Sequence, residues 1–581
     1  MPDTARTEPL VVPGEQAATP ALAALWRSAT VQALSLLALA SAIFFFHLGS
    51  YGLWEPDEAR YAEIAREMLA GGGLIVPHLN YVPYVEKPPL LYWLSAAWMA
   101  IFGVNEFAAR LTPALAALVG VLATWFFARR AMDPARALLA GAILATSILY
   151  AVMAQVLTTD MLLTATLTVA WFAMFLHWRE GGRWCWAGYA AIALGVLAKG
   201  PVAAVVAALT LAIFLWWEGE LRGAMRRFHV VAGGALVAVI AAPWFIVLAL
   251  REPGFADFYF VGEYLRRFFQ PSFSHGEPLY YYAPVLLGGL MPWTLFAPFI
   301  AWRALRRTPA GRFCVVAAAV VLTLFSAASG KLIPYILPAF APIAVLMADG
   351  LLARASPNVV EEKAARVTRL MALPGVILIA LGAAMLIVGT FARSFKSPYV
   401  LDTRSAIYAL AIIGLIGGLA VVQAFRRWRM AGGFVAFTLV AAVGLGAGSY
   451  IRLEAEPLRS YASFAREIAA RAPEATLVCY PHYVQALPFY TRRRVLLVGD
   501  PTELAFGEAH SRDAHDFFFR SEADALRLWN RPGPVVMVID PKELRALRDR
   551  LGKFTVIATG LHKSGILKTG GAPAGRSAWN R

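Results

Sequence analysis

Long apolar runs recur along most of this 581-residue chain, separated by short polar connections. Most of the runs are about 17 to 25 residues long, which lets an α-helix cross ~30 Å of hydrocarbon. The pattern therefore predicts membrane-spanning helices near 31–49, 106–128, 136–153, 161–178, 185–198, 201–217, 229–249, 281–302, 313–328, 333–352, 370–392, 405–425 and 432–450.

One further apolar stretch, 89–103, is ambiguous. Basic residues concentrate in cytoplasmic connections, and the six Arg-rich connections of this chain fall on one side only if 89–103 does not cross. We therefore expect 89–103 to lie in, or re-enter, the membrane interface. Thirteen spans then remain, with the N-terminus inside, the C-terminus outside, and the loops 50–105 and 251–280 on the outer face.

After about Glu454 the apolar runs become short. Residues 454–581 alternate β-rich runs with helical patterns, which predicts a soluble α/β domain on the outer, periplasmic side. The predicted strands are 475–480, 494–499, 534–540 and 554–560, and the predicted helices are 457–471, 521–530 and 541–551. The transmembrane domain then covers 26–453, and residues 1–25, rich in Pro, Ala and Thr, are predicted to be disordered.

Composition agrees with a polytopic α-helical membrane protein. Hydrophobic residues make up 59% of the chain and charged residues 15%, against ~45–50% and ~25% in soluble domains. These values exclude a disordered protein, a coiled coil and a disulfide scaffold. We attribute the net charge of +16 to inner loops, with a contribution from a site for phosphorylated lipid, and not to nucleic-acid binding.

The first outer loop carries charged residues directly after a span. Pro56 can open a helix, and Asp57 and Glu58 suit its positive N-terminal end. A solvated amphipathic helix would explain them without a function, but an ionisable group at this boundary is a functional candidate. Further along, Lys87 follows Glu86 and precedes two prolines that stiffen the chain. Its point charge suits a lipid phosphate, and snorkelling at a helix end is the alternative.

Two more charged residues are predicted on the outer face. Asp160 lies between two spans, where it can act as a helix N-cap and need no other role. Lys199 ends another span. Because Asp57, Asp160, Lys87 and Lys199 share this face, we expect a common polar site.

At these residues the sequence resembles a known family. The segments WEPDEARYAEIAREM, EKPPLLYWL, FGVNEFAARL, the stretch Gln155–Asp160, LGVLAKGP and SGKLIPYILPAFAP occur in this order over roughly residues 30–345. The series resembles the polyprenyl-phosphate-sugar-dependent glycosyltransferases of the GT-C fold class. Within that class it is most similar to the bacterial aminoarabinose transferases that modify lipid A.

The resemblance implies a donor, an acceptor and a location. The donor is undecaprenyl phosphate carrying 4-amino-4-deoxy-L-arabinose, and the acceptor is a phosphate of lipid A at the periplasmic face of the bacterial inner membrane. The acceptor phosphate attacks the anomeric carbon and undecaprenyl phosphate leaves. The outcome is resistance to cationic peptides such as polymyxin, and we expect the chain to act as a monomer among membrane lipids.

The chemistry suggests roles for the candidate residues. A phosphate is already nucleophilic at neutral pH, so the site must mainly assemble two anions and stabilise an oxocarbenium-like centre. We assign Asp57 and Asp160 as catalytic carboxylates, with Asp57 facing the sugar. The predicted substrate-binding residues are Arg60, Glu86, Lys87, Lys199 and Tyr335.

A metal is not required by this chemistry, although a zinc site remains open. Glu86, His275 and His482 would supply three ligands if the outer loops and the C-terminal domain brought them together. No HxxxH or HExxH spacing occurs, so three unrelated surface residues are the alternative.

Two other functions compete with this interpretation. A polyprenyl-phosphate-mannose-dependent protein O-mannosyltransferase would need a general base for its hydroxyl acceptor; Glu55 with Asp57 imperfectly matches the paired acidic motif of those enzymes. A lipid-linked sugar transporter would line a pathway with intramembrane charges, but the chain shows no inverted repeat.

Overall fold

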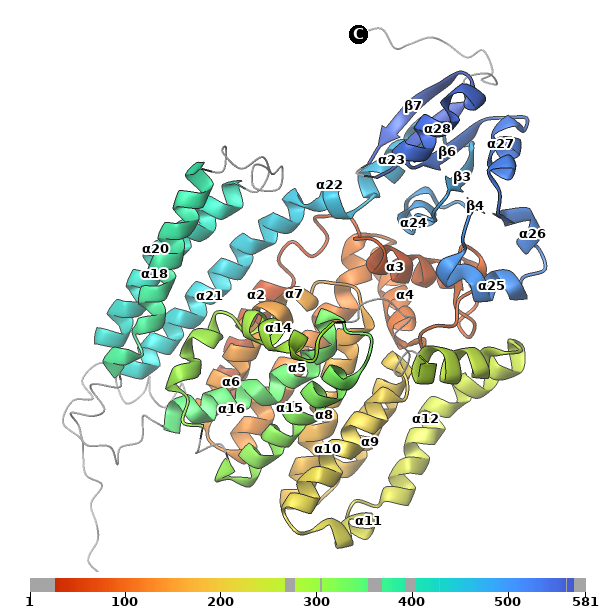
Figure 1. The fold of residues 1–581 in the computed structure, drawn as a ribbon. Coiled ribbons are helices and arrows are strands. Elements are labelled where there is room, and N and C mark those ends of the chain that lie inside the picture. Colours follow the sequence, from red (N-terminus) through yellow and green to blue (C-terminus); the bar gives the residue numbers. More distant parts are fainter. Residues whose placement is uncertain are drawn as a thin grey trace, which may run out of the picture.

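The chain folds as a bundle of apolar helices that carries a mixed β-sheet at one end (Figure 1). The structure is a computed structural model, and it describes residues 27–266, 277–302, 306–353, 368–391, 404–427, 429–560 and 562–568. A polytopic α-helical membrane protein with a strand-containing C-terminal domain is therefore confirmed.

The long apolar runs form long helices. Within the described residues, eight helices are long and apolar enough to cross a membrane, or nine if one bent pair counts as a span. The eight are α5 (Glu106–Ala131), α8 (Thr159–Glu180), α12 (Val230–Arg251), α15 (Pro309–Ala327), η7 with α16 (Ile333–Leu352), the segment Thr368–Phe391 that contains α18 (Leu373–Phe391), α20 (Arg404–Arg427) and α21 (Arg429–Glu454). The bent pair is Leu279–Gly289, which includes α14 (Tyr282–Gly289), with η5 (Trp293–Phe299), at 103° to each other.

The predicted count of thirteen spans is not confirmed, because some of the predicted spans in the described part of the chain form apolar helices of only 10–17 residues. They are α2 (Ala29–Phe44), α6 (Pro134–Thr146), α9 (Trp184–Lys199) and α10 (Val202–Trp217), and α4 (Leu90–Phe102) is a further short apolar helix. The run 136–153 divides because Ser147 takes an extended conformation, so α6 ends at Thr146 and α7 covers Ile148–Met153.

The stretch predicted not to cross is α4. Its 13 residues rise about 20 Å, short of the ~30 Å of hydrocarbon. It packs against α5 and against α3 (Asp57–Glu67), near the end of the bundle that faces the C-terminal domain (Figure 1). Between α3 and α4 the chain forms η1 (Met68–Gly72) and a small hairpin, β1 (His78–Leu79) and β2 (Val82–Pro83).

The C-terminal domain contains a six-stranded sheet in the order β5-β4-β3-β6-β8-β7. The four predicted strands are confirmed as β3 (Thr476–Tyr480), β4 (Leu496–Val498), β6 (Val535–Ile539) and β7 (Phe554–Thr559). The strands β5 (Phe518–Phe519) and β8 (Ser564–Lys568) were not predicted. The first four strands of this order pair in parallel, whereas β8 pairs antiparallel with β6 and β7.

The helices of this domain are α22 (Glu456–Arg459), α23 (Ala462–Arg471), α24 (Ala486–Thr491), α25 (Ala505–His510), α26 (Ala514–Phe517), α27 (Glu522–Asn530) and α28 (Pro541–Leu551). The predicted helices 457–471, 521–530 and 541–551 correspond to α22 with α23, to α27 and to α28, whereas α24, α25 and α26 were not predicted. The all-apolar strand Val535–Ile539 is fully buried, which is typical of a parallel strand covered on both faces.

The C-terminal domain is bonded to the first outer loop at several points. Asn80 and Val495 exchange two hydrogen bonds of 2.9 Å, between the Asn80 side chain and the Val495 backbone. Trp54 pairs with Ser460 in an isolated β-bridge, and the Tyr490 hydroxyl donates to Glu106 at 3.0 Å. These bonds place the domain directly over α3.

Candidate active site at the outer end of the bundle

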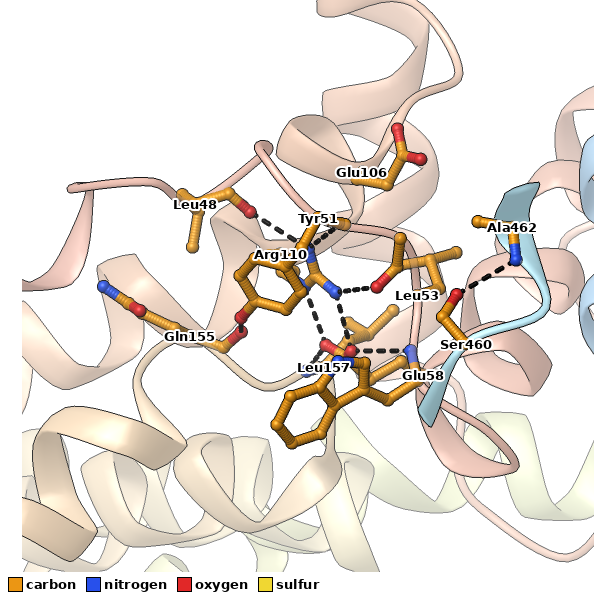
Figure 2. Close-up of polar contacts among 12 residues, drawn as sticks. Leu48, Tyr51, Leu53, Glu58, Glu106, Arg110, Gln155, Leu157, Ser460 and Ala462 are labelled. Atoms are coloured by element: carbon orange, nitrogen blue, oxygen red, sulfur yellow. Dashed lines mark hydrogen bonds and ion pairs between the residues drawn. The ribbon is translucent and has the colours of Figure 1, made fainter. Parts of the chain in front are cut away.

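A buried ion pair fixes the start of α3 (Figure 2). Arg110 of α5 donates two hydrogen bonds to the Glu58 carboxylate, from Nε at 2.8 Å and from Nη2 at 2.7 Å. The same carboxylate accepts backbone N–H groups from Trp54 at 3.0 Å and from Leu157 at 2.9 Å. Glu58 therefore ties the first turn of α3 to the chain that enters α8.

The remaining donors of Arg110 are also satisfied. They bond the carbonyl oxygens of Leu48, Tyr51 and Gly52 at 3.2, 2.8 and 3.0 Å, and the guanidinium lies 3.8 Å from the centre of the Tyr51 ring. Sequence reasoning missed this pair. The pair could have been anticipated from an arginine within a long apolar run, because such a charge needs an anionic partner.

Asp57 directly precedes Glu58 in the N-terminal turn of α3. Its side chain is 50% exposed and forms an ion pair with Arg60, one turn later. Arg60 also donates to Glu503 of the C-terminal domain at 3.2 Å. Arg60, predicted to hold a phosphate, is thus bonded to two carboxylates, one from each domain.

Lys87 lies where the two outer loops meet. Its ammonium group is 3.3 Å from a carboxylate oxygen of Glu263, in η3 (Asp257–Arg266) of the second outer loop. It also donates to the Glu86 carbonyl at 3.2 Å. The Glu86 side chain accepts the Tyr84 hydroxyl at 2.9 Å. Burial raises the pKa of Glu86, partly offset by Lys87 and Arg60.

Asp160 and Lys199 form an ion pair between α8 and the C-terminal end of α9. The Lys199 ammonium lies 4.4 Å from the centre of the Tyr335 ring, so three predicted residues come together. The alternative role of Asp160 as an N-cap is wrong. Thr158 is the N-cap residue of α8 and Asp160 lies inside the first turn.

Tyr61, which sequence reasoning did not select, lies beside Arg60 and Tyr92. Its side chain is buried in α3, and the Arg60 guanidinium lies 5.3 Å from its ring centre. Burial raises the pKa of the Tyr61 phenol, and the charges of Asp57, Glu86 and Asp160 raise it further while Arg60 lowers it. Tyr61 therefore lies within electrostatic range of all three acidic groups.

Glu55 has a different role from that of a second catalytic acid. Its carboxylate accepts the backbone N–H groups of Gln485 at 3.3 Å and Ala486 at 2.7 Å, at the start of α24. Burial raises its pKa to about 8, against the opposing effect of these two N–H groups and of Arg60. Glu55 therefore bonds the C-terminal domain to the outer loop.

The described residues give no support to the predicted zinc site. Among them, no group of three His, Cys, Asp or Glu side chains is arranged to hold a metal ion. His482 is 64% exposed, and its Nε2 lies 4.0 Å from Asp540. Glu86 is bonded to Tyr84, and His275 lies outside the described residues.

Two family models match separate parts of the chain. Residues 86–247 match the family described as dolichyl-phosphate-mannose-protein mannosyltransferase. Residues 464–563 match the aminoarabinose transferase C-terminal domain.

Curated relatives share the second description. The chain is 35% identical to undecaprenyl phosphate-α-4-amino-4-deoxy-L-arabinose arabinosyl transferase 2 of Pseudomonas fluorescens, over 59% of this chain and 59% of that relative. It is 32% identical to transferase 1 of the same organism, over 68% of this chain and 72% of that relative.

A solved structure has a similar fold. The chain superposes on ArnT from Cupriavidus metallidurans bound to undecaprenyl phosphate with a TM-score of 0.79 and 26% identity, over 94% of this chain and all of that one. The GT-C fold predicted from the sequence is thereby confirmed.

Proposed function

Because the chain belongs to the family of undecaprenyl phosphate-4-amino-4-deoxy-L-arabinose arabinosyl transferases, we propose that it moves this aminosugar from undecaprenyl phosphate to a phosphate of lipid A. The chain is a membrane glycosyltransferase. An oxygen of the acceptor phosphate forms a bond to the anomeric carbon, and the bond from that carbon to the donor phosphate breaks. Undecaprenyl phosphate leaves with the electron pair.

The observation that carries the proposal is a set of ion pairs formed by the candidate residues. Asp57 pairs with Arg60, Lys87 with Glu263, and Asp160 with Lys199 beside the Tyr335 ring. A cation stabilises the charge that develops on a leaving phosphate. A carboxylate stabilises an oxocarbenium-like centre. The phosphate nucleophile itself needs little deprotonation.

Individual residues take the following roles in this proposal. Asp57, half exposed at the N-terminal turn of α3, faces the sugar. Lys87 holds the donor phosphate, which takes the place of Glu263 beside the ammonium group. Lys199 and Tyr335 contact the substrates next to Asp160, the second acid. Arg60 keeps Asp57 in position through their ion pair and contributes charge to the site.

The orientation follows from the basic connections. Arg226 and Arg227 belong to α11 (Ala224–Arg227), which lies at the end of the bundle opposite the sheet domain (Figure 1). The positive-inside rule assigns that end to the cytoplasm. We place the enzyme in the bacterial inner membrane, with the site, both outer loops and the domain 454–581 in the periplasm.

The mannosyltransferase alternative has one observation in its favour, the family match over 86–247. That match lies within the helical part. The aminoarabinose transferase match over 464–563 covers the C-terminal domain, which is hydrogen-bonded to the first outer loop. A protein hydroxyl acceptor would also need a general base, and Glu55, the acid two residues before Asp57, is hydrogen-bonded to the C-terminal domain.

The proposal is tested by mass spectrometry of lipid A from cells that carry the gene and from cells that lack it. We expect an aminopentose adduct on lipid A phosphate only when the gene is present. A hexose on periplasmic proteins in place of that adduct would favour the mannosyltransferase, and unchanged lipid A with active donor synthesis would contradict the proposal.

A second prediction concerns the donor phosphate. Lys87→Ala should weaken binding of undecaprenyl phosphate by roughly ten- to a hundredfold, because a hydrogen bond to a charged group contributes about 1.5–3 kcal/mol. Lys87→Arg should recover only part, since a planar fork replaces a point charge. Binding is measured on purified protein at low salt, with Lys542→Ala on the exposed face of α28 as the control. Equal affinity of wild type and Lys87→Ala would remove Lys87 from the donor site.

A further inference from the structure

A closed ring of polar contacts joins the start of α3 to the C-terminal domain. Arg60 pairs with Asp57 through Nη2 and donates to Glu503 from Nη1 at 3.2 Å. The same oxygen of Glu503 accepts a hydrogen bond from the Gln485 side-chain amide. The backbone N–H of Gln485 in turn donates to Glu55 at 3.3 Å, two residues before Asp57. The ring thus begins and ends in the first outer loop, and two residues of the other domain close it.

The Glu503 side chain is also fixed from within its own domain. Glu503 lies in η10 (Thr502–Leu504), and its second carboxylate oxygen accepts the Thr502 hydroxyl at 2.9 Å. The Thr502 backbone N–H donates to Asp500 at 2.9 Å. Thr502 has a φ of 47°, which β-branched residues rarely adopt. Such strained residues cluster at functional sites and persist where their surroundings hold them. This loop therefore presents Glu503 to Arg60 in a fixed orientation.

Docking of the C-terminal domain does not depend on Glu503. The side chain of Asn80 and the backbone of Val495 exchange two hydrogen bonds elsewhere in the contact. The helix α24 packs against α3, and α25 packs against β2 of the hairpin (Figure 1). A Cβ atom added at Gly507 of α25 would overlap the Pro83 carbonyl oxygen, so this approach is close. The domain is thus already placed, and the Glu503 carboxylate is available for another role.

We propose that Glu503 and Gln485 are positioning residues for the transfer reaction: they hold one edge of the Arg60 guanidinium, so that its other edge orients the Asp57 carboxylate toward the sugar. The planar guanidinium suits this role, because its N–H groups are fixed relative to one another. The inference rests on the proposed function, in which Asp57 stabilises the developing positive charge. The C-terminal domain then contributes to turnover, although the reacting groups lie in the helical part.

Glu503→Gln tests the inference, because it keeps the shape of the side chain and removes the charge that holds Arg60. We expect kcat to fall by about ten- to a hundredfold, since a misplacement of roughly 1 Å can cost a hundredfold in rate. Binding of undecaprenyl phosphate should stay within a few-fold of wild type. The thermal midpoint in detergent should move little, because other bonds dock the domain.

Two conservative variants refine this test. Glu503→Asp keeps the charge on a shorter side chain and should recover part of kcat. Gln485→Met keeps the backbone N–H that donates to Glu55 and removes only the side-chain amide. It should lower kcat by a smaller factor than Glu503→Gln, because Glu503 keeps its bonds to Arg60 and Thr502.

Glu508→Gln is the matched control. The Glu508 side chain is 21% exposed, against 20% for Glu503. Its carboxylate accepts two bonds from Arg520 of the same domain, at 2.5 and 2.6 Å. The substitution therefore removes the charge of a comparable ion pair without touching Arg60. Its kcat should equal that of wild type.

A double variant tests whether Glu503 acts through Asp57. Once Asp57→Asn has removed the charge that is to be oriented, adding Glu503→Gln should not lower the residual turnover further. The same drop in both backgrounds would show that Glu503 acts independently of Asp57, and the inference would be overturned.

Other outcomes separate the inference from the proposed function. An unchanged kcat in Glu503→Gln or Gln485→Met, with active wild type, would overturn the positioning role alone. So would a fall in kcat that is matched by equal losses of undecaprenyl phosphate binding and of thermal stability, because the role is then merely structural. Wild-type protein without aminoarabinose transfer would overturn the function itself.

Discussion

Asp57→Asn is expected to lower turnover by at least about a thousandfold, at the upper end of the effect of removing one group that stabilises the transition state. The amide keeps the shape of the side chain and removes the negative charge that faces the developing positive charge on the sugar. Folding should be unaffected, because the Asp57 side chain is half exposed and Arg60 retains its bond to Glu503. Turnover is measured with purified enzyme, undecaprenyl-linked donor and lipid A.

The control for this prediction is Asp516→Asn, at an exposed carboxylate of α26 that is 63% exposed. Its turnover should equal that of wild type. Binding of undecaprenyl phosphate to Asp57→Asn should remain within a few-fold of wild type, which shows that the loss lies in the chemical step. Near-normal turnover of Asp57→Asn would exclude it as the essential carboxylate and make Asp160 the first candidate.

Arg110→Met should destabilise the folded protein by about 3–5 kcal/mol, the cost of leaving one partner of a buried ion pair alone. Glu58 would keep two backbone N–H bonds but lose both charged ones. Adding Glu58→Gln should restore part of the stability, because no unpaired charge then stays buried. Thermal unfolding in detergent, followed by the loss of monodisperse protein, gives the midpoints.

Arg466→Met is the matched control, because its ion pair with Glu106 involves an arginine side chain that is 54% exposed. Exposed pairs contribute about 1 kcal/mol or less, so the midpoint should move little. Similar shifts for Arg110→Met and Arg466→Met would show that the Glu58–Arg110 pair does not anchor α3.

Local periodicity accounts for the parts of the fold that the sequence predicted. Four strands of the sheet and the helices α27 and α28 follow from short apolar runs and period-3.6 patterns, which depend on neighbouring residues only. The strand β8 was not predicted because Ser564, Gly565 and Lys568 leave only two apolar residues in it, and its position is set by pairing with β6 and β7. Span number was harder to predict, because one extended residue, Ser147, divides a continuous apolar run.

The residues of the candidate site also include some that the sequence predicted and others that it did not. Asp57, Lys87, Asp160, Lys199 and Tyr335 were selected from charge at a membrane boundary and from family resemblance, and the structure pairs Asp160 with Lys199 beside Tyr335. Partnerships across long sequence distances were not predictable. Glu58 forms an ion pair with Arg110, some fifty residues away in the sequence. Glu55 is hydrogen-bonded to the backbone of α24, more than four hundred residues away. Only the folded chain brings these groups together.

The first outer loop and the C-terminal domain share several hydrogen bonds. These bonds decide which part of the enzyme could be exchanged between relatives as a unit. Asn80 binds Val495 just before β4, Glu55 binds the start of α24, and Glu503 binds Arg60 beside Asp57. A chimera that exchanges the C-terminal domain alone between relatives would place a foreign Glu503 equivalent beside an unmatched Arg60. The exchangeable unit is therefore the domain together with the loop 50–105. Exchanging this unit as a whole keeps the Glu503–Arg60 contact beside Asp57 intact.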